Sequence, residues 1–119
     1  MTLMGTQIHT LLTQQWVGQT FPRILQVSDG LTYTWDASLT DADKVIAASI
    51  EISGVPVVPG NSYRVTVNSF LADGGDNFSV LVDGTNRLGG EVDLDALVTY
   101  FGFNSPVAPG PQDRITRLN

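Results

Sequence analysis

The residues best suited to binding chemistry lie in one stretch, which runs from Tyr63 to Phe78 and reads YRVTVNSFLADGGDNF. Its first part alternates apolar and polar residues, which predicts a strand with one buried face. If that strand continues, Phe70 lies on the polar face, where its ring can stack on a flat ligand. Asp76 follows a double-glycine turn, where its carboxylate can accept two hydrogen bonds from a diol, as acids do for ribose in dinucleotide folds. Together these two residues describe a nucleoside-binding site.

Two glycines, Gly74 and Gly75, shape the turn before this acid. Glycine permits a positive φ and lets a ligand approach the backbone closely. Asn77, on the other side of the acid, also visits left-handed conformations more readily than most residues. A purely structural interpretation competes with the binding site, because Phe70 can bend into the core and Asp76 can merely cap the turn. From physical reasoning alone, the residues favour that structural interpretation.

An amphipathic helix is predicted over residues 5–16, because apolar residues recur there at helical spacing, and we expect it to end near Gly18. The residues on its buried face are Ile8, Leu11, Leu12 and Trp16. Short strands follow in the prediction, at residues 25–27, 31–36, 44–52 and 63–67. The later strands alternate apolar and polar residues, so each should bury one face.

A second helix is predicted from Asp93, which can cap its first turn, to Phe101. Its apolar residues share one face, which we expect to be buried: Leu94, Leu97, Val98 and Phe101. A helix, then strands, then a helix predicts an α+β fold, in which a mostly antiparallel or mixed sheet is covered by helices. The chain has no strand–helix–strand unit with a G-x-G-x-x-G loop, which disfavours a Rossmann fold.

The chain divides into a domain over residues 1–104 and a tail over residues 105–119. Prolines and a glycine crowd the tail, so we predict an extended segment or the start of a linker there. The first helix begins so close to Met1 that we expect a preceding element of the domain to lie outside this sequence.

Composition argues against several classes of partner. The 119 residues include twelve acids and six bases, which gives a formal net charge of −6. Such a chain repels phosphate backbones and anionic lipid surfaces, so we expect neither a nucleic acid nor a membrane as partner. The absence of cysteine excludes disulfides and thiolate metal sites. No apolar run approaches the roughly 18–20 residues of a membrane span.

Three other interpretations of the chain stay open. The acids between residues 73 and 83 offer oxygen ligands for calcium, although their spacing does not fit the EF-hand pattern. The letters GGDNF are similar to the G-G-[DE]-E-F hairpin of diguanylate cyclases, but an asparagine stands where that family has a metal-binding acid. A non-enzymatic adhesion or sugar-binding module would use an exposed tryptophan, Trp16 or Trp35, although both fit core positions better.

Five segments of the chain resemble the 5'-nucleotidase family, which also includes UDP-sugar hydrolases and 2',3'-cyclic-nucleotide phosphodiesterases. The segments are MGTQIHTLL, LQVSDGLTYTWD, NSFLADGGDNF, VDLDALVTYF and RITRLN. They follow the order of the family and span nearly the whole chain, and the last two match actinobacterial-type members. The resemblance implies the family's C-terminal substrate-binding domain and its fold, with the N-terminal part of that domain missing from this sequence.

The resemblance also implies roles for two residues. In the family, the aromatic at the position of Phe70 forms one side of a clamp around the base. The acid at the position of Asp76 binds the ribose hydroxyls, and Gly74 and Gly75 shape the turn between the two. The family's second stacking aromatic and its phosphate-binding arginines belong to upstream stretches that this sequence lacks.

Hydrolysis itself is implied for a part of the protein outside this chain. In the family, two divalent metal ions are held by a separate N-terminal metallophosphoesterase domain with D-x-H, G-D and G-N-H-[DE] motifs. This chain has one histidine, His9, which is too few for that centre, and we expect it to be solvated on its helix. We therefore expect no catalytic residue, metal or cofactor in this chain, and no activity from it alone. The parent would be a secreted 5'-nucleotidase, extracellular, cell-wall-associated or periplasmic, with its signal peptide upstream.

Overall fold

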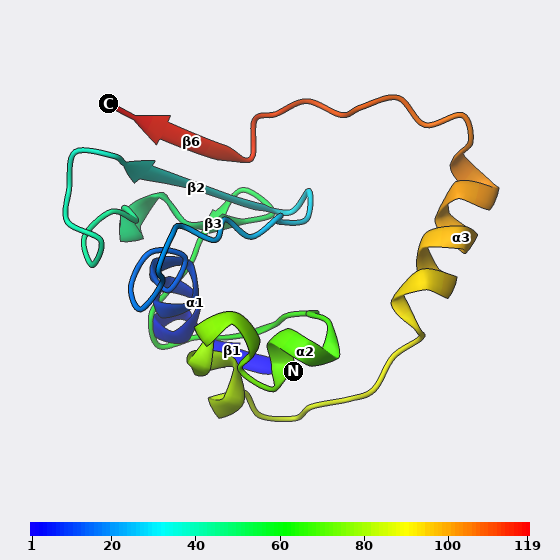
Figure 1. The fold of residues 1–119 in the computed structure, drawn as a ribbon, viewed down its shortest axis with the longest axis horizontal. Helices are drawn as coiled ribbons and strands as arrows, with labels where there is room; N and C mark the ends of the chain where they lie inside the picture. Colours follow the sequence, from blue (N-terminus) through cyan, green and yellow to red (C-terminus); the bar gives the residue numbers. More distant parts are fainter.

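Helix α1 (Gly5–Thr13) lies at the centre of the computed structural model, which describes every residue from Met1 to Asn119. One sheet contains β2 (Leu31–Asp36), β3 (Glu51–Ile52), β4 (Val55–Pro56) and β6 (Ile115–Leu118), in the order β4-β3-β2-β6. In a second sheet, β1 (Thr2–Met4) pairs antiparallel with β5 (Ser62–Arg64). In the view of Figure 1, α1 lies between β2 above it and β1 below it.

The larger sheet is mixed, because β2 pairs antiparallel with β3 and parallel with β6. The remaining elements are η1 (Ala47–Ser49), α2 (Ser69–Ala72), η2 (Gly75–Asn77), η3 (Ser79–Asp83) and α3 (Asp93–Asn104), where η marks a 3-10 turn. The predicted α+β class with a mixed, helix-covered sheet is confirmed. No helix is both long enough and apolar enough to cross a membrane.

The core gathers buried residues of α1, of the turn that follows it, of β2 and of η3. All four apolar residues predicted for the buried face of the first helix are buried: Ile8, Leu11, Leu12 and Trp16. Tyr33 of β2 is buried as well, and its hydroxyl lies 3.0 Å from the amide nitrogen of the Gln15 side chain. Burial raises the pKa of Tyr33 above its usual value. The regular helix ends at Thr13, earlier than predicted, and turns lead on to Gly18, whose φ is +79°.

The strand predicted over residues 44–52 is wrong for most of its length. Val45 forms only an isolated bridge with Trp35, η1 follows, and β3 covers two residues. The reason lies in Ser49, whose hydroxyl oxygen accepts a hydrogen bond from the amide of Thr34 at 2.8 Å. A side chain thus takes the place of a backbone ladder partner, and Val45 and Ile50 are buried without forming a continuous strand.

Two other strand predictions also need correction. No strand forms at residues 25–27, where the amide of Leu25 donates to the side chain of Gln15 at 2.7 Å. The strand predicted over residues 63–67 ends at Arg64, as β5. Its continuation toward residue 70 is wrong, because α2 begins there instead.

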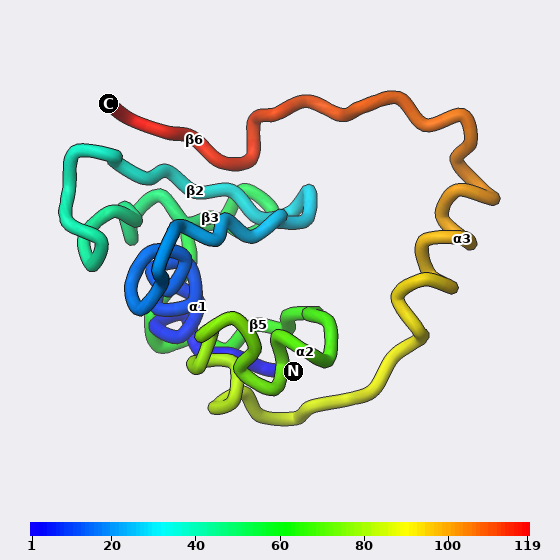
Figure 2. The backbone as a smooth tube through the Cα atoms, viewed as in Figure 1, coloured from blue at the N-terminus to red at the C-terminus, as the bar shows by residue number.

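Helix α3 confirms the predicted start at Asp93 but not the predicted packing. Figures 1 and 2 show it standing away from the rest of the chain, joined to the body by two extended connections. The four residues predicted for its buried face are all exposed: Leu94, Leu97, Val98 and Phe101. The spacing of apolar residues shows which side of a helix can pack, but it does not supply the surface on which to pack.

The tail predicted over residues 105–119 contains a strand that the prediction missed. Residues 105–114 form no helix or strand, but β6 then pairs with β2 in parallel, with Ile115 opposite Tyr33. Arg114 fixes this return, since its Nη1 donates to the carbonyl of Val27 at 2.9 Å.

Candidate functional site

Phe70 lies in the first turn of α2, and its ring points out of the core. Asn68 caps the helix, because its Oδ1 accepts a hydrogen bond from the amide of Leu71 at 2.8 Å. This cap ends the extended backbone after β5 and starts the helical turn. Phe70 is 58% exposed, so the interpretation in which it bends into the core is wrong.

The ring of Phe70 rests on the glycine turn that follows α2. A Cβ atom at Gly75 would lie 2.6 Å from the ring atoms Cε1 and Cζ and from the backbone oxygen of Phe70. Only glycine allows so close an approach. Gly74 has a different requirement, because its φ of +82° lies in the left-handed region. The two glycines therefore shape the turn in two ways, one by conformation and one by lacking a side chain.

Asp76 directly follows Gly75, on which the Phe70 ring rests, and its side chain is accessible to solvent. Its backbone has a φ of +55°, and Asn77 follows with a φ of +62°. The Asp76 side chain is 38% exposed, and its Oδ1 lies 3.3 Å from Nη1 of Arg23. An ion pair this exposed contributes no more than about 1 kcal/mol to stability. Because the Phe70 ring touches the residue before Asp76, the structure brings the predicted aromatic and the predicted acid to neighbouring positions.

A loop that sequence reasoning did not single out holds the turn in place. We call residues 18–23 the bracing loop. Its Gln19 donates from Nε2 to the backbone oxygen of Asp76 at 2.7 Å. In the other direction, Nδ2 of Asn77 donates to the backbone oxygen of Gly18 at 3.2 Å. The Arg23 side chain completes the brace through its ion pair with Asp76.

The bracing loop carries no signal of its own in the sequence. Gln19 and Arg23 stand in a segment without periodicity, and the contact from Gln19 to Asp76 joins positions 57 residues apart. The sequence offers only the opposite charges of Arg23 and Asp76, and many pairs of surface residues have opposite charges.

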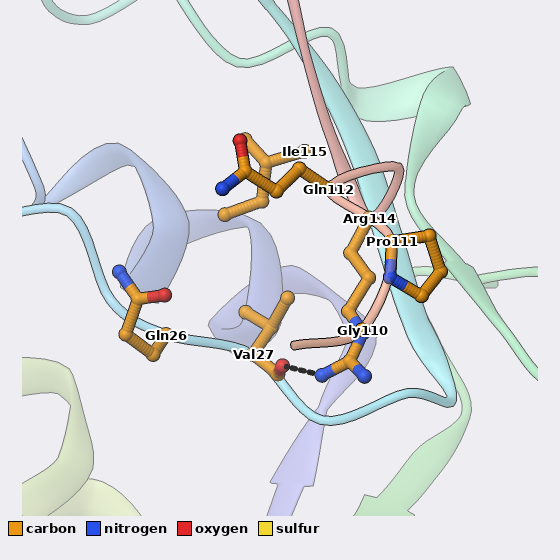
Figure 3. A pocket seen from close by; sticks show the side chains of 7 residues that line it. All are labelled: Gln26, Val27, Gly110, Pro111, Gln112, Arg114 and Ile115. Carbon is orange, nitrogen blue, oxygen red and sulfur yellow. Dashed lines mark hydrogen bonds between the residues drawn. The ribbon is translucent and has the colours of Figure 1, made fainter. Parts of the chain in front are cut away.

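Two clefts lie elsewhere on the molecule. One, of about 380 Å³, lies between Val27 and the return to β6, and Figure 3 shows Arg114 crossing it to the carbonyl of Val27. The other, of about 400 Å³, is lined in part by Trp35 and Phe21. Neither is lined by Phe70 or Asp76, so the predicted nucleoside site belongs to neither of these two clefts.

The two tryptophans pack against each other but differ in exposure. Trp16 is buried, and its ring lies 4.9 Å from that of Trp35, measured between centroids. Trp35 is also covered by β6, because the guanidinium carbon of Arg117 lies 5.3 Å from the centroid of its ring. Trp16 therefore offers no exposed indole for sugar binding, whereas Trp35 is half-buried and lines the second cleft.

The side chains of this chain do not fit the implied metal centre. No three or more His, Cys, Asp or Glu side chains gather closely enough to hold a metal ion. Two of the acids offered for calcium are each engaged by a different arginine, Asp73 by Arg87 at 2.8 Å and Asp76 by Arg23. His9 is half-buried rather than solvated, with Nε2 lying 3.3 Å from the backbone oxygen of Val45. The arrangement at Phe70 and Asp76 offers a flat apolar face and an anionic acceptor, which suits binding.

The chain is similar to known proteins over most of its length. A family model described as "5'-nucleotidase, C-terminal domain" matches residues 1–83. An apyrase from Tabanus yao is 31% identical over 114 residues, which cover 90% of this chain and 20% of that protein. A snake venom 5'-nucleotidase from Macrovipera lebetinus is 29% identical over 109 residues, which cover 86% of this chain and 26% of that protein.

A solved structure is similar along the whole chain. The crystal structure of a 5'-nucleotidase precursor from Thermus thermophilus is 34% identical, with a TM-score of 0.85. The match covers 100% of this chain and 24% of that one. The chain thus spans about a fifth to a quarter of the length of these three proteins.

Proposed function

Since this chain belongs to the family of 5'-nucleotidase C-terminal domains, we propose that it holds the nucleoside end of a substrate within a longer protein that hydrolyses nucleotide phosphate esters. One observation carries the proposal. The exposed ring of Phe70 is seated on Gly75, directly before the accessible carboxylate of Asp76. A stacking face and a hydrogen-bond acceptor are the two groups that the base and the ribose of a nucleoside would need.

In this proposal the base stacks on Phe70 and the ribose hydroxyls donate to Asp76. Stacking on one aromatic face contributes about 1–3 kcal/mol, and a hydrogen bond to a charged acceptor about 1.5–3 kcal/mol. Association costs offset much of this sum. We therefore expect adenosine to bind with a dissociation constant of about 1 mM or weaker, which corresponds to about −4 kcal/mol.

The hydrolytic step is proposed for another part of the longer protein. The side chains of this chain assemble no metal-binding group, so we assign no step of the reaction to them. We expect the chain alone to bind nucleosides without hydrolysing phosphate esters. We also propose that the longer protein works outside the cytoplasm, a proposal supported by the venom origin of one relative.

The test is a titration of adenosine into ¹⁵N-labelled protein. Amides around residues 70–77 should shift first, and Phe70→Ala should weaken binding at least about fivefold, because the stacking face is lost. Phe103→Ala is the matched control, since Phe103 is 87% exposed on α3, outside the proposed site. Shifts confined to another surface, or equal affinities of the two variants, would show that the nucleoside site lies elsewhere or does not exist.

A further inference from the structure

We propose that Arg23 is a positioning residue for Asp76, which fixes the carboxylate before a ligand arrives and thereby sets how strongly the site selects for ribose hydroxyls. The inference rests on the proposed function for its ligand. Its structural basis is the set of contacts between the bracing loop and the turn at Asp76.

Arg23 is itself held in place from several sides. Its backbone amide donates to the backbone oxygen of Gln15 at 2.8 Å. Its Nε donates to Oε1 of Gln19 at 3.1 Å, and its guanidinium carbon lies 4.7 Å from the ring centroid of Phe21. Because these contacts restrict the long side chain in advance, the guanidinium reaches Asp76 as a fixed group rather than as a mobile one.

Asp76 needs such a partner. Its backbone is fixed in the left-handed region, and its carbonyl accepts the bond from Gln19. Its carboxylate has one ion-pair contact, from Arg23 to Oδ1, and no hydrogen bond to another side chain or amide. Without Arg23 the carboxylate would rotate among its rotamers, and a ligand would have to immobilise it on binding.

The contact with Arg23 also gives the two carboxylate oxygens of Asp76 different surroundings. Oδ1 faces Arg23, which leaves Oδ2 free to accept a hydrogen bond from a sugar hydroxyl. A fixed Oδ2 should favour a ribose with hydroxyls over a sugar without them. The base, which stacks on Phe70, should not be affected by Arg23.

The experiment compares two ligands on three proteins. Adenosine and 2',3'-dideoxyadenosine are titrated into the wild-type chain, Arg23→Gln and Arg23→Lys. We expect Arg23→Gln to weaken adenosine binding about three- to tenfold and to leave the dideoxynucleoside within about twofold, because only adenosine uses the carboxylate. Arg23→Lys should restore part of the loss, since lysine keeps the charge but not the guanidinium geometry. Equal losses for both ligands would overturn the positioning role and indicate a merely structural one.

A matched control tests whether any arginine near the turn matters. Arg87→Gln removes a comparable ion pair, to Asp73, three positions before Asp76. We expect it to leave the ratio of the two affinities unchanged. A change as large as that of Arg23→Gln would refute a specific role for Arg23.

A second readout separates this inference from the proposed function. If the wild-type chain does not bind adenosine at Phe70, the proposed function fails, but the position of the carboxylate can still be measured. Side-chain scalar couplings of Asp76 should report one χ1 rotamer in the ligand-free wild type and averaged rotamers in Arg23→Gln. Identical couplings in the two proteins would overturn the inference, whatever the ligand result.

Discussion

Gly75 is the residue on which the geometry of the candidate site depends most directly. Its missing side chain lets the Phe70 ring lie against the turn, and the backbone oxygen of Phe70 is equally close. A ring can rotate away from an added methyl group, but a backbone oxygen inside a capped helical turn cannot do so without moving the helix.

Replacing Gly75 with alanine should therefore disturb both fold and site. We expect Gly75→Ala to lower the free energy of unfolding by about 1–3 kcal/mol, because the new Cβ overlaps backbone as well as ring. Urea denaturation followed by circular dichroism measures this change. Gly89→Ala is the control, since a Cβ there meets nothing within 4 Å. If both variants were equally stable, the close approach of the ring to the turn would not exist in solution.

At the residue scale, sequence reasoning singled out Phe70 and Asp76 for the candidate site but expected the wrong element for Phe70. Phe70 was expected on a strand, whereas it lies on a short helix. The signal that would have corrected this is Asn68, an N-cap residue placed before Ser-Phe-Leu. Arg23 could not have been chosen in advance, because its role arises only when distant segments meet.

At the scale of elements, α1 and α3 both carry apolar residues at helical spacing but have opposite environments. The family resemblance predicted from five segments is confirmed by the match over residues 1–83 and by the similar solved structure. The predicted burial of α3 is wrong. The spacing of apolar residues is a property of one segment, whereas burial also requires a second segment that packs against it. The strand predicted over residues 44–52 failed because the Ser49 side chain takes the amide of Thr34, which leaves only a bridge at Val45 and the two residues of β3.

The contrast between the two helices can be measured. Leu12 in α1 is 1% exposed, and Leu97 in α3 is 52% exposed. We expect Leu12→Ala to cost about 2–5 kcal/mol of stability, and Leu97→Ala less than about 0.5 kcal/mol. Chemical denaturation of the two variants provides the comparison. A similar cost for both would mean that α3 is covered in solution, and sedimentation at several protein concentrations would then test whether a second copy covers it.

At the scale of the whole molecule, arginines fasten both ends of the segment that carries α3. Arg64 donates to the backbone oxygen of Asn86 at 2.8 Å, shortly after the segment leaves the body. Arg114 holds the other end through Val27 and through Asp29, whose Oδ1 lies 3.3 Å from its Nη2. These charge-assisted contacts fasten the two ends of the segment, whereas no salt bridge joins α3 to the rest of the chain.

The contacts of Arg114 with Val27 and Asp29 predict that this arginine slows the local opening of β6. Arg114→Gln should increase the hydrogen-exchange rates of the β6 amides, because the contacts to Val27 and Asp29 are lost, and leave α1 unchanged. Exchange followed by mass spectrometry on peptides from both elements measures the difference. Arg117→Gln is a useful control, since Arg117 lies within β6 but contacts the Trp35 ring instead of the turn. Unaltered exchange in β6 would show that its pairing with β2 needs no arginine.

The parallel pairing of β2 with β6 also sets an order of events during synthesis. Val27 and Arg114 are 87 residues apart, so a growing chain completes β2 long before its neighbour exists. At about 5–20 residues per second, one edge of β2 stays without a partner for several seconds. An unpaired edge is where chains join each other, so a ribosome-bound intermediate of this protein should be more prone to association than the finished chain.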